Sequence, residues 1–241
     1  MSFPRNGTIW DRGKEGFSLR TSDSRHVGAL LSCIPLLGLF AYLAMAISRN
    51  TSGSFDSPII ALIQGVEEPW LTKWANFLAT IGSGSVVVSL AILLAIALFF
   101  GNRREQALFV LVVVIGSGAL NQILKIIFQR ERPTLHRLAE IGGYSFPSGH
   151  AMLAVSLYGV LAYLSWKAIK KSSGRIFVLF LAGAMMVSIG ASRIYLGVHY
   201  PSDVVAGMSI SAIWFIISSV FYGAYERKRI KVRQQEAENP S

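Results

Sequence analysis

The sequence predicts an all-α membrane protein with six transmembrane helices in a bundle. Of its 241 residues, 52% are hydrophobic and only 15% are charged, whereas soluble domains carry roughly 25% charged residues. The apolar residues gather in long runs, and most of the 23 lysines and arginines fall on one side of the membrane that these runs imply. Composition, run length and charge distribution therefore all favour a chain that crosses the bilayer several times.

Six apolar runs are candidate spans, because about 20 helical residues cross a hydrocarbon core of roughly 30 Å. The second and fourth runs are short, and we expect their helices to extend into the flanking residues. The first run follows a polar leader and exceeds the ~7–15 residues of a signal-peptide core, so no cleavable signal is predicted. The runs are Val27–Ile47, Ser85–Phe100, Ala107–Phe128, Ala151–Trp166, Ile176–Ile194 and Val204–Tyr222.

The stretch Ser57–Gly82 precedes the second run and has apolar residues at mixed spacing. Its Trp70 and Trp74 are typical of the membrane interface. We expect one or two short helices here, lying against the outer face of the bundle.

Basic residues set the predicted orientation. With six spans both termini lie on one side, and the positive-inside tendency places this side, which is richer in Lys and Arg, in the cytoplasm. Residues 1–241 then form one integral-membrane domain, with a helical bundle over 26–222 and a basic cytoplasmic tail over 223–241. The tail is interpreted as a membrane anchor and not as a nucleic-acid site, and Cys33, the single cysteine, cannot form an internal disulfide. The basic residues on this side are Arg5, Arg12, Lys14, Arg20, Arg25, Arg103, Arg104, Lys167, Lys170, Lys171, Arg175, Arg227, Lys228, Arg229, Lys231 and Arg233.

Three polar stretches stand at the ends of the last four runs. They read KIIFQRERP (Lys125–Pro133), PSGH (Pro147–His150) and SRIYLGVHYPSD (Ser192–Asp203). The third and fifth runs end on the outer side, and the fourth and sixth begin there, so span parity brings all three stretches to the same face. The sequence therefore predicts an active site at the outer, extracytoplasmic membrane face.

Three cations in these stretches point to an anionic ligand. Lys125, Arg132 and Arg193 would repel one another at the same depth unless an anion lay between them. The planar fork of arginine matches phosphate, and lysine adds a point charge. Ser148 and the backbone N–H of Gly149 stand at a predicted helix start, where free N–H groups bind phosphate oxygens. These five residues form the predicted phosphate-binding site.

The candidate catalytic residues stand at two predicted helix starts. Pro147 and Pro201 mark these starts, because proline suits a first helical position. His199 precedes Asp203 by four residues, so the carboxylate could accept one ring N–H and leave the other nitrogen free to attack phosphorus. His150 is then the acid that protonates the leaving oxygen and the base that later activates water. His199, Asp203 and His150 are the predicted catalytic residues.

Each of these residues has a plainer interpretation when it is taken alone. Lys125 could reach the interface by snorkelling, Arg132 and Arg193 could anchor helices there, and Ser148 could be a helix cap. The two histidines could be hydrogen-bonded packing residues. Their combination on one face favours a functional site, because all the plainer interpretations would otherwise have to coincide there.

Two alternative functions stay open. His150, His199 and Asp203 could form a two-histidine, one-carboxylate metal site, although three nearby cations would oppose a divalent ion, so no metal or other cofactor is predicted. A lipid transporter or scramblase could bind a phosphate headgroup without cleaving it. Such a protein would use the cations but leave the histidine–carboxylate pair idle.

The three stretches resemble the signature of the type 2 phosphatidic acid phosphatase family, the lipid phosphate phosphatases. The signature reads K-x6-RP, PSGH and SR-x5-H-x3-D, and every position matches over the third to sixth runs. The resemblance implies a six-helix membrane phosphatase that works through a phosphohistidine and without metal. It assigns His199 as nucleophile, Asp203 as its partner and His150 as acid and base. It assigns to the phosphate Lys125, Arg132, Ser148, Gly149 and Arg193.

The same signature occurs in soluble vanadium haloperoxidases, against which the six apolar runs argue, and in glucose-6-phosphatase-like enzymes. The short loops are similar to those of bacterial members. A site at the membrane edge can receive a headgroup while the chains stay in lipid, so we expect a membrane lipid phosphate as substrate. We place undecaprenyl diphosphate first, because recycling of that carrier uses an outward-facing phosphatase, with phosphatidylglycerol phosphate close behind and phosphatidic acid third; the motifs do not separate them. We expect specificity to lie in residues 54–85 and 134–144, and the sequence predicts no oligomeric state.

Overall fold

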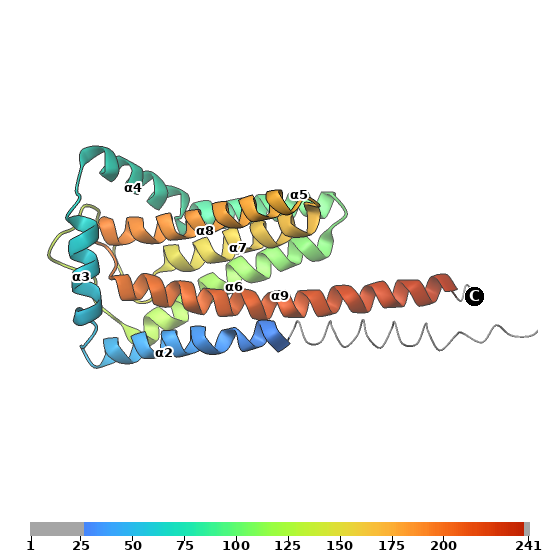
Figure 1. Ribbon diagram of the computed structural model, residues 1–241, viewed down its shortest axis with the longest axis horizontal. Coiled ribbons are helices and arrows are strands. Elements are labelled where there is room, and N and C mark those ends of the chain that lie inside the picture. Colours follow the sequence, from blue (N-terminus) through green and yellow to red (C-terminus); the bar gives the residue numbers. More distant parts are fainter. Residues whose placement is uncertain (1–26, 239–241) are drawn as a thin grey trace, which may run out of the picture.

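All regular structure in the computed structural model, which describes residues 27–238, is helical (Figure 1). The elements are α2 (Cys33–Ser48), α3 (Gly53–Gln64), α4 (Pro69–Ile81), α5 (Gly84–Phe100), α6 (Arg104–Phe128), α7 (Gly149–Ala168), α8 (Ser172–Tyr195) and α9 (Pro201–Glu238).

Five helical segments are long and apolar enough to span a membrane, and a bent pair supplies a sixth. The short second run corresponds to α5, a helix of 17 residues. It continues from α4 through a bend of 48°, so α4 and α5 together satisfy the test for one span. The all-α prediction with six spans is confirmed in this form. The basic residues predicted before Val27 lie outside the described part of the chain.

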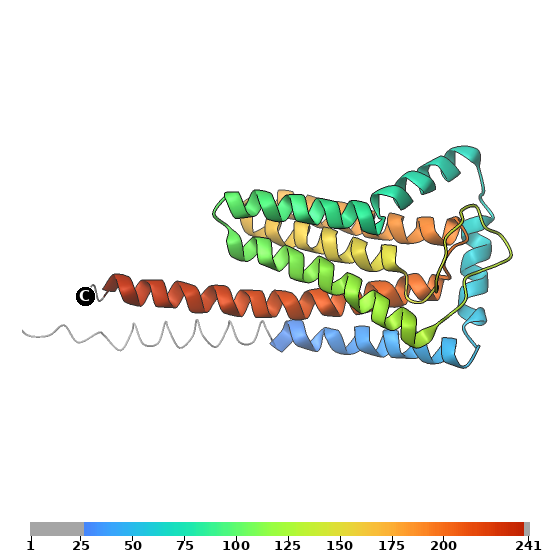
Figure 2. The same cartoon turned by 180° about the vertical axis from the view of Figure 1, so that it is seen from behind.

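The long helices run side by side, with α2 along α9, α5 along α6, and α7 among α6, α8 and α9 (Figures 1 and 2). Their facing sides form a core in which Val110, Val113 and Val114 of α6 meet Leu157 and Val160 of α7. Large apolar side chains also cover the outside of the bundle, which suits contact with lipid chains. Exposed examples are Leu93, Phe100, Ile126, Phe177, Phe180 and Phe221.

Buried polar side chains join the central helices. Ser211 of α9 lies 3.1 Å from the hydroxyl of Ser117 on α6 and 3.0 Å from that of Ser156 on α7, and it donates to the carbonyl of Met152. Asn121 of α6 donates to the Pro147 carbonyl just before α7. Hydrogen bonds of this kind fix helices against one another where water is absent, so α7 is held on both sides.

One end of the bundle carries all three polar stretches. The last turns of α6 and α8 and the first turns of α7 and α9 lie at the end that α3 crosses, at the left in Figure 1. The stretch Ser57–Gly82 forms two short helical parts, as predicted, but only α3 lies across this end. The following α4 packs along α8 and leads into α5.

The last helix is longer than the predicted span. We predicted that the span ends at Tyr222 and is followed by a basic tail, whereas α9 continues to Glu238 as one helix of 38 residues. Ion pairs of Arg229 with Glu105 and of Lys167 with Glu226 fasten the extension to neighbouring segments. The basic residues of the tail therefore lie on a continuous helix.

Candidate active site

The PSGH stretch forms the entry to α7. The helix begins at Gly149 with Ser148 as its N-cap, so the prediction that Pro147 occupies the first helical position is wrong. Asn121 binds the Pro147 carbonyl instead, and this contact holds the proline before the helix. The Ser148 N–H donates to the Asp203 carbonyl at 3.0 Å. Gly207 allows this approach, because a Cβ there would lie 2.9 Å from the Ser148 carbonyl oxygen.

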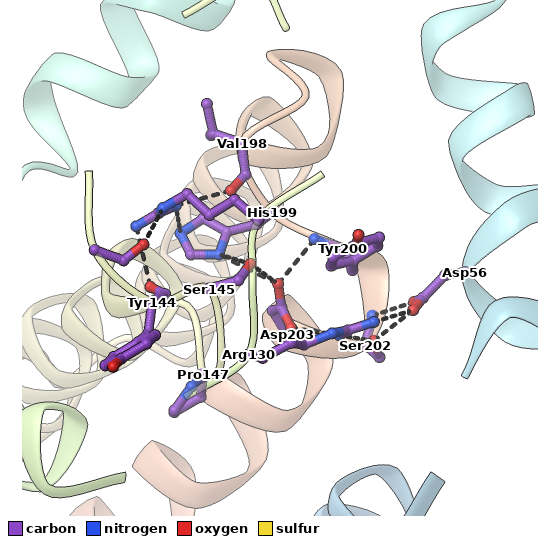
Figure 3. Close-up of polar contacts among 12 residues, drawn as sticks. Asp56, Arg130, Tyr144, Ser145, Pro147, Val198, His199, Tyr200, Ser202 and Asp203 are labelled. Atoms are coloured by element: carbon purple, nitrogen blue, oxygen red, sulfur yellow. Dashed lines mark hydrogen bonds and ion pairs between the residues drawn. The ribbon is translucent and has the colours of Figure 1, made fainter. Parts of the chain in front are cut away.

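The predicted histidine–carboxylate pair is formed at the entry to α9. Nδ1 of His199 lies 3.4 Å from Oδ2 of Asp203, and both side chains are buried. The same carboxylate oxygen accepts the Tyr200 N–H at 2.9 Å and the Ser145 hydroxyl. Figure 3 shows the His199 ring turned toward Ser145 and Asp203. A carboxylate beside Nδ1 favours the tautomer whose lone pair is on Nε2.

The free ring nitrogen faces a fixed cation. Nε2 of His199 lies 3.2 Å from Nη1 of Arg132. The guanidinium of Arg132 also donates to three carbonyls, those of Gly143, Tyr144 and Val198. These contacts leave few of the five N–H donors of arginine for a ligand, so Arg132 lies beside Nε2 of His199 as a charge with a fixed orientation.

Two further predicted phosphate ligands hold unpaired donors. Arg193 is only 1% exposed. Within residues 27–238, its Nε and Nη2 and the Ser148 hydroxyl are the buried side-chain nitrogen and oxygen atoms that lack a hydrogen-bond partner. The Ser148 hydroxyl also makes no cap bond to its own helix. Buried donors without partners are costly, and an anion that accepts from all of them would satisfy the site.

The remaining predicted residues lie around the same centre. The positive charge of Arg132 acts electrostatically on Lys125, which is half-buried near the end of α6. His150 lies within the field of Arg193, Lys125 and His199, and its Nε2 is 3.1 Å from the Ala79 carbonyl. The α4 helix therefore orients His150, a contact that the sequence did not predict.

The metal alternative finds no matching geometry. Within the described residues, no three His, Cys, Asp or Glu side chains lie together as a metal site would require. Arg132 occupies the space beside Nε2 of His199, and its fixed charge opposes a divalent cation there. The arrangement suits an anion.

A cavity of about 870 Å³ opens beside His199. Hydroxyl and amide side chains line much of it, among them Ser52 and Gln64 from the α3 region and Thr134 from the loop before α7. His199 belongs to both this cavity and the cation cluster. Of the predicted site residues, His199 lines the cavity, whereas Lys125, Arg132, Ser148 and Arg193 do not.

Burial controls the charge of His199, the predicted nucleophile. It lowers the pKa of His199 to about 4, with a smaller contribution from the positive charges of Arg132 and Arg193, while Asp203 acts in the opposite direction. The imidazole is therefore neutral near pH 7, as nucleophilic attack requires.

The acid side of the pH–rate profile should follow this residue. Protonation removes the Nε2 lone pair, so we expect kcat/KM to fall as pH decreases through about 4 and not through the ordinary value of 6.5. Stopped assays over the full range, with activity regained at pH 7 as the control, would test this. An acid midpoint near 6.5 would contradict the assignment.

Three residues at the centre were not predicted. Ser145 binds the carboxylate of Asp203, and Arg130 joins this carboxylate to Asp56 on α3. The sequence offered one signal for Arg130, its place within the K-x6-RP stretch. Asp56 lies in a segment without a motif, so only the fold brings it to the site.

Comparisons with known proteins agree with the motifs. The profile of the PAP2 superfamily matches residues 106–227. Phosphatidylglycerophosphatase B of Bacillus subtilis is 32% identical over 199 residues, which cover 82% of this chain and 98% of that protein. An undecaprenyl-diphosphatase of Sulfolobus acidocaldarius is 29% identical, over 77% of this chain and 88% of that protein.

A solved structure is similar as well. It is the crystal structure of a transmembrane PAP2 type phosphatidylglycerolphosphate phosphatase from Bacillus subtilis, with a TM-score of 0.73 and 32% identity. The similarity covers 78% of this chain and 94% of that chain. The helical arrangement described above is thus shared with a membrane phosphatase, over nearly the whole length of that phosphatase.

Proposed function

Because the chain belongs to the PAP2 superfamily, we propose that it removes phosphate from a membrane lipid through a phosphohistidine on His199, without a metal. The prediction of a multi-pass membrane phosphatase of this family is confirmed at the level of the family. The proposal extends this result to particular residues. It also treats residues 1–241 as a single domain.

The observation that carries the proposal is the coincidence of a nucleophile with unpaired donors. His199 is neutral, paired with Asp203 and next to Arg132, while Ser148 and Arg193 present buried donors without partners. A phosphoryl group that accepts from these donors would bring its phosphorus to Nε2. The cations then stabilise the charge on its oxygens in the transition state.

The proposed reaction has two steps. Nε2 of His199 forms a bond to phosphorus as the bond to the leaving oxygen breaks, and His150 gives its proton to that oxygen. Asp203 stabilises the positive charge that the ring gains. Water, deprotonated by His150, then attacks the phosphohistidine, releases inorganic phosphate and returns His199 to its neutral form.

The cavity favours a substrate with a polyol headgroup. Hydroxyl and amide side chains such as Ser48, Ser57 and Gln129 can hydrogen-bond to glycerol hydroxyls. The relative that the chain covers almost completely is named for phosphatidylglycerophosphate. We therefore place phosphatidylglycerol phosphate first, and undecaprenyl diphosphate, the first expectation from the sequence, second.

The proposed orientation puts the site on the extracytoplasmic side with both termini in the cytoplasm. The basic loops after α5 and α7 and the extension of α9 lie at the end opposite α3 (Figure 1), which fits the positive-inside tendency.

Phosphate release from a panel of lipids tests this function. We expect the purified enzyme, with EDTA present throughout, to hydrolyse phosphatidylglycerol phosphate faster than undecaprenyl diphosphate or phosphatidic acid, and all three faster than a water-soluble phosphate ester. In sealed right-side-out vesicles the phosphate should appear outside. Loss of activity in EDTA that a divalent ion restores, or lipid transfer between leaflets without phosphate release, would contradict the proposal.

A further inference from the structure

Arg130 lies between two buried carboxylates that come from distant parts of the chain. Its Nη1 is 2.6 Å from Oδ1 of Asp203, and its Nη2 is 2.8 Å from Oδ2 of Asp56. Figure 3 shows the guanidinium extended between them, with Asp56 reaching in from α3. The side chains of Asp203 and Asp56 are 0% and 3% exposed, and that of Arg130 is 12% exposed. Solvent therefore does little to screen these contacts.

The two oxygens of Asp203 have different partners. Oδ1 accepts from Arg130, while Oδ2 lies next to Nδ1 of His199 and accepts from Ser145 and the Tyr200 N–H. The contact at Oδ1 fixes the rotation of the carboxylate, so that Oδ2 faces the ring. It also supplies the opposite charge that a fully buried carboxylate needs.

The terminal nitrogens of Arg130 are fully engaged by the protein. Its Nη1 also binds the Ser202 hydroxyl at 2.7 Å, and its Nη2 also binds the Ser52 hydroxyl at 2.9 Å. These two bonds and the two ion pairs use all four N–H groups on its terminal nitrogens. The guanidinium also stacks on the Tyr200 ring, with its carbon 3.8 Å from the ring centre. Arg130 thus differs from Arg193, whose Nε and Nη2 have no hydrogen-bond partner.

Asp56 ties α3 to the same assembly by a second route. Its carboxylate accepts the Ser202 N–H and the Ser202 hydroxyl, each at 2.8 Å. This N–H belongs to the first turn of α9, where backbone donors lack helical partners. One carboxylate of α3 therefore fixes both Arg130 and the start of the helix that carries Asp203.

We propose that Arg130 is a positioning residue of the reaction: held by Asp56 and Ser52, it fixes the Asp203 carboxylate in the orientation that His199 needs. The proposal rests on the function proposed above. It makes the first turn of α3 part of the catalytic unit, although α3 lies outside the three motifs. Arg130 acts through Asp203 and contacts neither the phosphate nor the nucleophile.

Kinetics of Arg130→Gln, Asp56→Asn and their double variant test the assignment. We expect Arg130→Gln to lower kcat about 10- to 100-fold, the cost seen when the hydrogen-bonding partners that orient metal-bound histidines are removed, with Arg130→Lys restoring part of the rate. The inhibition constant of inorganic phosphate should stay unchanged, because the phosphate donors are intact. Asp56→Asn should have a smaller effect, and adding it to Arg130→Gln should lower kcat no further. The exposed Lys73→Gln on α4 serves as the matched control.

Several outcomes would overturn the proposal. Wild-type kcat in Arg130→Gln, or a phosphate inhibition constant that rises as kcat falls, would show that Arg130 does not act by positioning. Additive losses in the double variant would show that Asp56 does not act through Arg130. If Arg130→Gln does not fold, the same readouts apply to Arg130→Lys and Asp56→Asn. An active His199→Gln enzyme would instead refute the proposed function, whereas an inactive one beside a normal Arg130→Gln enzyme would refute only the positioning role.

Discussion

Replacing His199 with glutamine is expected to lower phosphate release by about 10⁴-fold or more, because the attacking atom itself is removed. Glutamine has a polar side chain of similar length but no nucleophilic nitrogen, so the first step, formation of the phosphohistidine, cannot occur. The donors on Arg193 and Ser148 remain, and binding of inorganic phosphate should therefore be retained. The measurement is initial-rate phosphate release with saturating lipid substrate.

Trapping the intermediate gives an independent readout of the same variant. Substrate labelled on its phosphorus should leave acid-labile, base-stable label on the wild-type chain when turnover is quenched, and no label on His199→Gln. Lys73→Gln is the control, since this lysine is exposed on α4 and does not line the cavity. Label that persists in the His199 variant, or that lies on another residue, would contradict the mechanism.

Arg193→Met is expected to move activity and stability in opposite directions. Loss of the guanidinium should lower kcat/KM by about 10²- to 10³-fold, the usual cost of removing a donor to a developing oxyanion. The free energy of unfolding should rise by about 1–3 kcal/mol, because an apolar chain of similar length replaces a buried cation with unpaired donors. Arg193→Lys should lie between the two in activity, since it keeps the charge but loses the fork.

Thermal unfolding with and without inorganic phosphate separates these effects. Phosphate should raise the melting temperature of the wild-type protein, because a ligand that binds only the folded state stabilises it, and should do so much less in Arg193→Met. A methionine variant that melts below the wild type and keeps its activity would show that Arg193 is structural.

Most of the fold could be predicted from hydropathy, because the bilayer requires long apolar helices. The bent pair of α4 and α5 could not, since neither Pro69–Ile81 nor Gly84–Phe100 passes the span test alone. The entry to α7 was misplaced because Pro147 suits a first helical position, whereas Asn121, 26 residues earlier, holds it outside the helix. The contact with Asn121 therefore outweighed the preference of proline for a first helical position.

The candidate site was predictable where it depends on spacing and parity. The pairing of His199 with Asp203 follows from their separation by four residues, and parity placed the three stretches together. The partners of Arg130 and His150 were not predictable, because Asp56 and Ala79 are more than 70 positions away and neither belongs to a motif. Such contacts depend on how α3 and α4 cross the end of the bundle.

The uninterrupted course of α9 has a consequence for whatever is attached to the end of the chain. A helix of 38 residues is about 57 Å long at 1.5 Å per residue, whereas the hydrocarbon layer is roughly 30 Å thick. With Pro201 near one boundary, a rod of about 25 Å projects beyond the opposite boundary. A reporter fused after Glu238 would therefore stand clear of the lipid headgroups.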